Sequence, residues 1–383
     1  MKYFICDITG RTINYDEALC EALGEVVHQE CSVEFWSQGG HRSLYYTYRP
    51  FYSVVPSRYK NSRSIFVLFL KALDTIFAFF IVFFRLLKNK PDVFHLQWLP
   101  FLSLGNRGAN IDFFFLELMR KISARTKFVF TIHNMCPHGM KEDGRMAYNT
   151  LFAKAMEYFD CYVVHTHKTK DEVCQTFGLA ENKVVVIHHG VFIPKDIVFE
   201  RKQWDQADVH IIMYGSQNWY KGTDVLVKAL QLIPNEYKER IHVRICGVVD
   251  GEMQKECSDV AVNVDLSWDN YYLTDEQLYK RINESDIIVL PYRRISQSGV
   301  LLLALATNRI IITSDLPTFK ETLCNYDENL FFESENPSSL ADLIVRYINE
   351  GIDREEVLEK LSELKGLYSW SSAANKTLQL YNR

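Results

Sequence analysis

Short apolar runs alternate with amphipathic stretches along almost the whole chain, and this alternation limits the fold more than any other feature. Each run has the length of a buried strand, and the stretches between the runs repeat apolar residues with the period of a helix. In the first half we expect strands at residues 2–8, 92–98, 127–133, 161–167 and 183–190. We expect helices at residues 16–23, 65–87, 113–124, 148–158 and 168–177. Strands separated by helices predict βαβ units and parallel sheets.

A second alternating series begins after a polar stretch that has no sustained period. Its expected strands are residues 209–215, 242–248, 261–267, 286–292 and 309–315, and its expected helices are residues 223–232, 274–283, 300–307 and 338–350. We therefore expect an α/β protein with two Rossmann-like, doubly wound domains, at residues 1–192 and 208–368, joined by a linker at 193–207. A C-terminal helix at 369–383 is expected to cross back to the first domain. Two such domains would face each other across a cleft, with ligands at the carboxyl ends of the strands.

Charge and cysteine content limit the partners and the compartment. The 383 residues carry a formal net charge of −5 and no long run of Lys or Arg, so a nucleic-acid partner is not expected. The nine cysteines form no Cys-x-x-Cys pair and lie mostly in apolar stretches, which is typical of a reducing cytoplasm. The first residues have the pattern of a strand and a helix, not that of an export signal.

Residues 64–90, SIFVLFLKALDTIFAFFIVFFRLLKNK, form the most apolar segment of the chain. The uninterrupted apolar core runs only from Ile76 to Phe84, because Lys71 and Asp74 break the stretch, whereas a membrane span needs about 20 apolar residues. The pattern leaves two alternatives: a helix buried on most sides, or a helix that lies in a bilayer surface near anionic head groups. Residues 65–87 are therefore a candidate peripheral membrane contact.

A first candidate site lies in the stretch MYGSQNWYKGTDVLVKAL. The expected strand ends at Tyr214, Gly215 permits a sharp turn, and Lys221 and Gly222 precede an amphipathic helix. A mobile ammonium group and free backbone N–H groups would then converge at the end of a strand, which suits a diphosphate. The alternative is an ordinary loop with a solvated lysine.

A second candidate site follows the strand DIIVLPY, where Ser298 and Gly299 precede a helix that begins near Val300. The amides of these three residues would point outward at the positive end of the helix dipole, and Gly299 would let a ligand approach without a β-carbon in the way. The alternative is a joint in which glycine only allows close packing. Together, the two sites could hold one diphosphate from two sides.

These motifs resemble a known family. The stretches YGSQNWYKGTDVLVKAL, SDIIVLPYRRISQSGVLLLALATNRIIITSDLPTFKE and YSWSSAANKTLQLY are similar to the C-terminal domain of GT-B glycosyltransferases, in particular the family 4-like group. DVFHLQWLP and FTIHNMCPH resemble the acceptor domain of that group. The resemblance implies that Lys221 holds the phosphates of a nucleotide-sugar donor, that the amides around Ser298 and Gly299 cap the diphosphate, and that His133 faces the donor sugar. Asn134 and His138 are weaker candidates, and His95, His165 and His167 are expected to be structural.

The sequence departs from the family pattern at three positions of the donor site. Ser216 replaces an arginine, and Ser296 and Ala304 replace two glutamates. Donor recognition would have to be rebuilt, since a lost carboxylate removes charge-assisted hydrogen bonds to hydroxyl groups. Arg293 could supply the missing cation or could be a solvated loop residue. Glu321 could reach a sugar or ribose hydroxyl, or could be a first-turn glutamate that favours the helix dipole.

The expected reaction is glycosyl transfer without a metal. The sequence has no Asp-x-Asp pair and no zinc-type cluster of His and Cys, so positive charge and helix amides would stabilise the leaving nucleotide diphosphate. If the reaction inverts the anomeric centre it needs a base, for which Asp7 and His133 are the candidates. The resemblance suggests a saccharide or lipid-linked saccharide acceptor and a role in cell-surface polysaccharide assembly, in the cytoplasm or at the inner face of the membrane.

Other functions fit parts of the same pattern. A sugar-nucleotide epimerase would share the two-domain layout and the phosphate sites, and a non-catalytic partner of another glycosyltransferase would account for the missing glutamates. A nicotinamide dehydrogenase is not expected, because the sequence has no Gly-x-Gly-x-x-Gly turn after a strand.

Overall fold

The computed structural model of the chain divides into two compact units. Unit 1 comprises Met1–His189 and Trp370–Arg383, and unit 2 comprises Gly190–Ser369. The structure describes residues 1–27, 31–55, 64–135, 142–191, 197–200, 208–261, 263–295, 298–350 and 353–383. Most of the expected linker, together with His138 and Ser296, lies outside these described residues.

Unit 1 is built on a parallel sheet whose strand order, among the described residues, is β3-β2-β1-β4-β5-β6-β7. The strands are β1 (Lys2–Asp7), β2 (Ser32–Ser37), β3 (Thr47–Pro50), β4 (Val93–Leu96), β5 (Lys127–Thr131), β6 (Cys161–Val164) and β7 (Val184–Val186). The five strands expected in the first half are confirmed. Strands β2 and β3 were not expected, and they extend the sheet at one edge.

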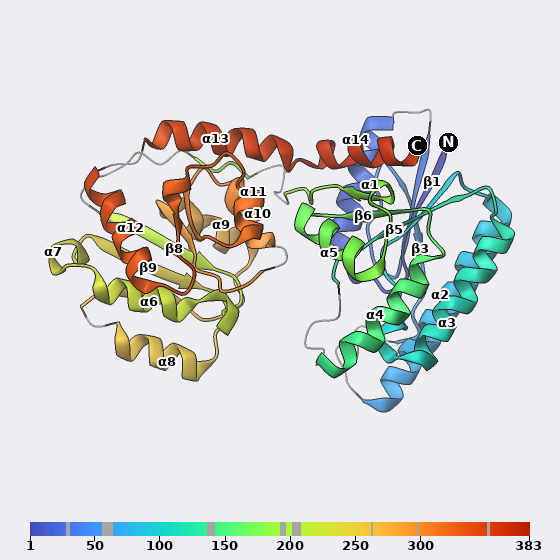
Figure 1. Cartoon of the computed structure of the whole chain (residues 1–383), viewed down its shortest axis with the longest axis horizontal. Helices are drawn as coiled ribbons and strands as arrows, with labels where there is room; N and C mark the ends of the chain where they lie inside the picture. The colour runs from blue at the N-terminus through green and yellow to red at the C-terminus, as the bar shows by residue number, and fades with distance from the viewer. Residues whose placement is uncertain are drawn as a thin grey trace. The chain divides into compact units, whose positions relative to one another are not determined.

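Helices cover both faces of this sheet (Figure 1). They are α1 (Ile13–Val27), α2 (Ile65–Asn89), α3 (Asn106–Ile122), α4 (Glu142–Met156), α5 (His167–Phe177) and α14 (Trp370–Tyr381), with short 3-10 helices η3 (Leu102–Leu104) and η4 (Glu181–Lys183). Successive residues of β1 alternate between two cores: Tyr3 and Ile5 pack with α1 and α14, whereas Phe4 and Cys6 pack with α2, α3 and α4. This period of two is the expected behaviour of a strand that is buried on both faces.

The C-terminal helix α14 belongs to unit 1 and is bonded to its sheet. The Tyr381 hydroxyl lies 2.7 Å from Nδ1 of His95, and Lys127 donates from Nζ to the carbonyl of Leu380. Nε2 of His95 also lies 2.7 Å from Oγ1 of Thr131. His95 is therefore held between α14 and β5, which agrees with a structural role.

Unit 2 has a second parallel sheet, ordered β10-β9-β8-β11-β12-β13 in the described part of the unit. Its strands are β8 (Val209–Tyr214), β9 (Ile241–Cys246), β10 (Asp265–Asp269), β11 (Ile287–Leu290), β12 (Ile310–Ser314) and β13 (Phe331–Phe332). The third expected strand, at residues 261–267, is displaced: β10 begins at Asp265 and ends at Asp269.

The helices of unit 2 pack on this sheet around a single apolar core. They are α6 (Thr223–Leu232), α7 (Asn235–Lys238), α8 (Gly251–Val260), α9 (Asp275–Glu284), α10 (Gly299–Leu305), α11 (Pro317–Thr322), α12 (Pro337–Glu350) and α13 (Arg354–Leu367), with 3-10 helices η5 (Trp219–Lys221) and η6 (Glu328–Leu330). Helix α6 has the bounds that its sequence predicted.

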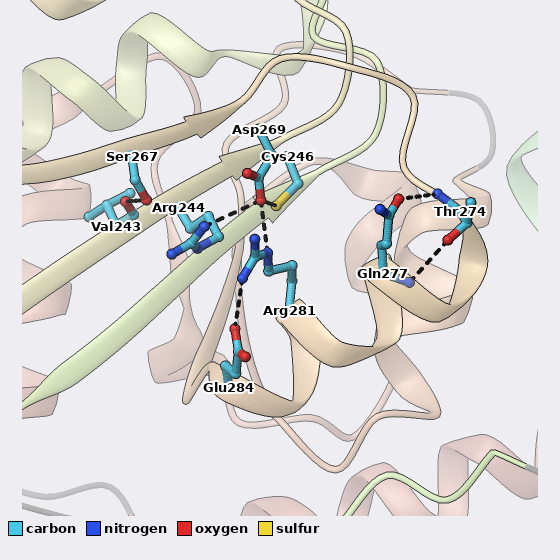
Figure 2. A network of polar contacts seen from close by, with 9 residues as sticks. All are labelled: Val243, Arg244, Cys246, Ser267, Asp269, Thr274, Gln277, Arg281 and Glu284. Carbon is cyan, nitrogen blue, oxygen red and sulfur yellow. Dashed lines mark hydrogen bonds and ion pairs between the residues drawn. The ribbon is translucent and has the colours of Figure 1, made fainter.

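A polar network joins the edge strands of unit 2 to helix α9 (Figure 2). Asp269, at the end of β10, accepts from Nε of Arg281 at 2.9 Å and from Nη1 of Arg244 at 3.4 Å. Arg281 also pairs with Glu284, and Thr274 and Gln277 form a capping box at the start of α9. The charged groups of this network pair with one another, so the network stabilises the edge of the sheet.

Helix α2 is not buried on most sides, so the first of its two alternatives is wrong. Ala78, Phe79, Val82 and Leu86 are buried in the core of unit 1, but many large apolar side chains of the helix are exposed. By its length and composition the helix could cross a membrane, and only 28% of its most apolar 18-residue stretch is buried. One face of α2 therefore packs on the unit while the other faces outward.

Candidate functional site

The loop after β8 is shaped by two glycines with positive φ. Gly215 has φ +96° and Gly222 has φ +71°, values that L side chains rarely adopt. A β-carbon at Gly222 would also collide with the carbonyl oxygen of Pro291 in the loop after β11. Glycine at position 222 thus lets the loops after two neighbouring strands touch. Both loops follow the carboxyl ends of their strands, where parallel sheets bind ligands.

Lys221 is a buried cation between these loops. Lys221 is the last residue of η5 and is 6% exposed. Its Nζ lies 5.3 Å from the centre of the Tyr292 ring. Burial lowers the pKa of the Lys221 ammonium to about 8. Within the described residues no carboxylate pairs with Nζ. The solvated-lysine alternative is therefore wrong.

The two candidate sites of unit 2 meet at Gly215. A β-carbon built on Gly215 would lie 2.6 Å from Nζ of Lys221 and 3.2 Å from Cγ2 of Val300. The Tyr214 hydroxyl donates to the carbonyl of Val300 at 2.9 Å, which ties the end of β8 to the start of α10. The structure thus brings together Gly215, Lys221, Gly222 and the start of α10 from two separate stretches of the sequence.

The start of α10 is open rather than tightly packed. Ser298 is the N-cap, and its hydroxyl oxygen accepts from the amide of Leu301. Gly299 is the first helical residue, and a β-carbon there would meet no atom of the described residues within 4 Å. The close-packing alternative for Gly299 is therefore wrong. The amides of Gly299 and Val300 stand in the first turn, where an α-helix leaves its N–H groups without an intrahelical acceptor.

In unit 1, His133 lies just after β5 and packs against aromatic side chains. Its imidazole stacks on Trp98 with centroids 5.1 Å apart and packs at the edge of Tyr15 at 5.0 Å. Nε2 lies 3.0 Å from the side-chain oxygen of Gln97, and Nδ1 lies 3.4 Å from Nε2 of His165. Burial, followed by the neighbouring His165, holds the pKa of His133 well below its usual value, so the ring is neutral.

Both ring nitrogens of His133 are engaged. Nδ1 of His165 lies 2.9 Å from the carbonyl oxygen of Ile187, which can only accept. Burial lowers the pKa of His165 to about 3, so that neutral ring carries its proton on Nδ1 and offers the lone pair of Nε2 to Nδ1 of His133. On the other side of the His133 ring, Nε2 lies 3.0 Å from the Gln97 side-chain oxygen, which also only accepts. His133 is therefore a neutral, rigidly held imidazole that contacts Gln97 and His165.

Two cavities lie side by side in unit 1. A cavity of about 230 Å³ is bordered by His133, Asn134 and Trp98, and one of about 640 Å³ is bordered by Thr9, Gln38 and helix α2. Arg11 borders both cavities, and its guanidinium lies 5.4 Å from the Trp98 ring centre. The two cavities are therefore neighbours, with Arg11 between them.

Both units match the same group of enzymes. The family described as Glycosyl transferases group 1 matches residues 194–363, and Glycosyltransferase Family 4 matches residues 18–193. The chain belongs to the GT-B, family 4-like glycosyltransferases. This confirms the family and the fold that the sequence motifs implied.

Individual relatives of this glycosyltransferase are distant. It is 24% identical over 243 residues to an uncharacterised glycosyltransferase of Methanocaldococcus jannaschii and 24% identical over 232 residues to a GDP-mannose:glycolipid 4-beta-D-mannosyltransferase of Xanthomonas campestris. Each match covers 59% of this chain and 62% of the relative's length. The solved structure of E. coli trehalose-6-phosphate bound with UDP-2-fluoro glucose superposes with a TM-score of 0.68 at 12% identity, covering 100% of this chain and 99% of that one.

Asp7 stabilises the fold of the chain and is not available as a base. It is fully buried, and its two carboxylate oxygens accept from the amides of Thr9, Gly10 and Thr12 and from the Thr9 hydroxyl. The carboxylate thereby shapes the loop after β1 that carries Arg11. We correct the assignment of Asp7 from a candidate base to a residue that holds this loop.

Arg293 is likewise already engaged. Nη1 and Nη2 each lie 2.9 Å from an oxygen of Asp224, Nη1 also donates to the carbonyl of Trp219, and Nε lies 3.3 Å from Glu335. The pKa of Arg293 is raised by its hydrogen bonds to Asp224. Arg293 is therefore neither a free cation for the phosphates nor a solvated loop residue. Carboxylates neutralise its guanidinium, which holds the loop that carries Lys221 in place.

The remaining donor-site residues differ in their surroundings. Ser216 is exposed in the loop after β8, and Glu321 is partly exposed in the last turn of α11, so Glu321 is not a first-turn residue. Ala304 is buried in the core of unit 2 and offers no group to a ligand. Arg294 is exposed, with its guanidinium 5.7 Å from the Trp219 ring centre, and it has no carboxylate partner among the described residues.

Sequence reasoning missed the ring cluster that holds His133. Tyr15, from α1, has its ring 5.0–5.4 Å from the rings of His133, His165, His189 and Trp370. The only signal was that the expected strands 127–133, 161–167 and 183–190 each carry histidine near their carboxyl ends, since the carboxyl ends of parallel strands share one edge. Within the described part of the chain, no three His, Cys, Asp or Glu side chains form a metal-type group.

Proposed function

We propose that the protein transfers a sugar from a nucleotide diphosphate donor, which binds at the loops after β8 and β11 of unit 2. The observation that carries the proposal is Lys221, a buried ammonium against Gly215 and Val300 without a carboxylate partner in the described residues. An unpaired buried cation is costly, so the site is arranged to gain a negative group from a ligand. The diphosphate is the part of the donor that supplies this negative charge.

The first turn of α10 supplies the second half of the proposed diphosphate site. The Val300 side chain and Nζ of Lys221 both approach Gly215, so the start of α10 lies close to the ammonium group. Helix amides and an ammonium group are fixed donors that stabilise the charge of a leaving diphosphate. The proposed transfer uses these groups in place of a metal ion, in keeping with the lack of an Asp-x-Asp pair in the sequence.

We assign the acceptor to the histidine end of unit 1. His133 presents a neutral, rigidly held imidazole beside the cavity that Arg11 and Trp98 border. A neutral imidazole can exchange hydrogen bonds with a sugar hydroxyl without a change of charge. With Asp7 engaged, His133 is also the candidate base in the described part of unit 1 if the reaction inverts.

The acceptor in this proposal is a saccharide or a lipid-linked saccharide, and the pathway is the assembly of a cell-surface polysaccharide. The Xanthomonas relative, named a glycolipid mannosyltransferase, supports this class of acceptor. The proposed location is the cytoplasm, at the inner face of the membrane, where nucleotide sugars and lipid-linked acceptors meet.

Calorimetry of the whole protein with UDP, GDP, CDP and their sugars tests the donor site. One nucleotide should bind with a Kd in the micromolar range, and Lys221→Met should weaken that binding by at least 100-fold. Lys228→Met is the matched control, because Lys228 is exposed on α6 and pairs with Asp224. The proposal fails if no nucleotide binds or if Lys221→Met binds as well as the wild type.

A second arm separates binding from transfer. His133→Phe should keep the stacking on Trp98, leave the affinity for the free nucleotide unchanged and lower transfer by about 100-fold, as expected for a lost group that acts on the sugar. Incubation of the donor without any acceptor is the control for an epimerase. Conversion of the donor sugar to its epimer would replace glycosyl transfer as the assigned reaction.

A further inference from the structure

Helix α2 carries an apolar stripe along its outer side. Large apolar residues follow one another at spacings of three or four, which places them on one face of an α-helix. Each is at least 42% exposed. We call these residues the outer stripe: Phe66, Phe69, Leu73, Phe77, Phe80, Phe84 and Leu87. The stripe extends over about 30 Å, given 1.5 Å per residue.

The outer stripe is not needed to hold the helix in place. Ala78, Phe79, Val82 and Leu86 pack into the core on the opposite side of α2, where Phe79 stacks on Phe115 with ring planes 2° apart. Near the start of the helix, Asp74 accepts from the Ser53 hydroxyl and from the amide of Val54. The helix is thus fixed by its inner side, and the stripe is a run of neighbouring exposed apolar side chains of the kind that marks an interaction surface.

Charge near the stripe is positive. Lys88, four residues after Phe84, and Lys90 are exposed, and neither has a carboxylate partner in the described chain. Arg107 is also exposed, three residues after Leu104, which borders the same cavity as Leu68 of α2. The one carboxylate of α2, Asp74, is buried and hydrogen-bonded. Basic groups beside an apolar helix face match the chemistry of an anionic lipid surface.

The larger cavity of unit 1 lies against the other side of the same helix. Leu68, Lys71 and Thr75 of α2 form part of its wall, and Arg11 borders both this cavity and the one beside His133. Leu68 and Leu104, both exposed, border the larger cavity. The cavity behind α2 therefore neighbours the cavity at the histidine end.

We propose that the outer stripe of α2 seats unit 1 on an anionic bilayer, and that the 640 Å³ cavity behind α2 receives the head group of an acceptor held in that bilayer. The second part rests on the proposed function, because it gives that enzyme a lipid-linked acceptor. The first part is independent of catalysis. Phenylalanine rings enter the acyl boundary while Lys88 and Lys90 remain at the phosphates, as long basic side chains do.

Vesicle cosedimentation of the full chain, without donor or acceptor, tests the seating. Vesicles of phosphatidylcholine with 30 mol% phosphatidylglycerol, about a third anionic lipid, should bind the wild type at least 10-fold more strongly than phosphatidylcholine alone. Phe77→Glu/Phe84→Glu should lower binding at least 10-fold, and Lys88→Glu/Lys90→Glu should remove the preference for the anionic vesicles. Leu232→Glu/Tyr272→Glu, which changes two exposed apolar residues of unit 2, should bind as the wild type does.

Each alternative occupant gives a distinct result. Equal binding by the wild type and Phe77→Glu/Phe84→Glu overturns the proposal, and so does binding that survives alkaline carbonate, which indicates a spanning helix. A wild-type dimer that does not bind vesicles and that becomes monomeric in the variant assigns the stripe to a second copy instead. Far-ultraviolet circular dichroism and thermal unfolding of the same variant show whether unit 1 is folded. The proposed function can therefore fail while the seating holds, or the reverse.

Discussion

Nζ of Lys221 lies 2.6 Å from the point that a β-carbon on residue 215 would occupy, so Gly215 and Lys221 share one small space. The glycine is required by its φ of +96° and by the amine that fills the space beside it. A charged group held in this way has lost much of its water and gains more from a bound anion than an exposed lysine would.

Two glycine substitutions should separate folding from donor binding. Gly299→Ala should leave thermal stability within about 0.5 kcal/mol, because its β-carbon would meet no atom of the described residues and alanine favours the helix. It should nevertheless weaken nucleotide binding about 10-fold if a diphosphate lies there. Gly215→Ala should lower both stability, by about 1–3 kcal/mol, and nucleotide affinity. Unchanged nucleotide affinity in Gly299→Ala would exclude the start of α10 from the donor site.

Lys221→Met should make the protein more stable near pH 7 while removing donor binding. Below pH 8 the lysine is charged in both the folded and the unfolded state, and burying that charge costs about 3 kcal/mol for a pKa of about 8 against 10.5. Between pH 8 and pH 10.5 the folded wild type has lost the proton that the unfolded chain keeps, so its stability rises with pH. Urea unfolding at pH 7 and pH 10 should show the advantage of methionine shrink as pH rises. A constant difference would mean that Lys221 is not buried as a cation.

Arg293 and Asp224 should behave as one unit in a double-mutant cycle. Their two 2.9 Å contacts bridge the loop after β11 and helix α6, and the Arg293 side chain is 9% exposed. Arg293→Ala and Asp224→Ala should each lower the free energy of unfolding, and the pair should show a coupling of about 1–2 kcal/mol. Additive losses in chemical denaturation would show that Arg293 stabilises the loop without this partner.

The cavity beside α2 should make the enzyme prefer amphiphilic acceptors. In transfer assays without vesicles, octyl glycosides should have a KM at least 10-fold lower than methyl glycosides of the same sugars, because the alkyl chain can lie on Leu68 and Leu104. Leu104→Gln should reduce this preference, and Leu367→Gln, at an exposed leucine of α13, should not. Equal KM values for both acceptor series would mean that the alkyl chain of an acceptor does not contact the exposed leucines at the border of the cavity.

Much of the fold follows from the period of the apolar residues. Strands such as Ile310–Ser314 are continuous apolar runs, and Thr223–Leu232 has both a clear helical period and a glycine before it. Strand Ser32–Ser37 was missed because polar residues alternate with its apolar ones, and Thr47–Pro50 because an edge strand of four residues has little apolar signal. Strand β2 is placed by pairing with β1 and strand β3 by pairing with β2, which no local pattern reveals.

The donor site could be predicted in part because backbone features are local. A strand end, Gly215 and Lys221 lie within eight residues, so the sequence reports them directly. The partners of Asp7 are close in the sequence, at residues 9–12, but the turn that aims their amides at the carboxylate is not visible in the residue pattern. The role of Arg293 could not be predicted, since its partner Asp224 lies 69 residues away in the sequence. Tyr15 was missed for the same reason: its four ring neighbours come from parts of the chain between residues 133 and 370.

Helix α14 places the last residues of the chain in the unit that the first residues begin. Ala373, Ala374, Leu380 and Tyr381 complete one core of unit 1, and Tyr381 holds His95. During synthesis, unit 2 is therefore translated in full before unit 1 has all its parts. Until residues 370–381 are made, one core of the amino-terminal half lacks a helix, so the synthesis of that helix, rather than passage of residue 189, is the step after which unit 1 can become native.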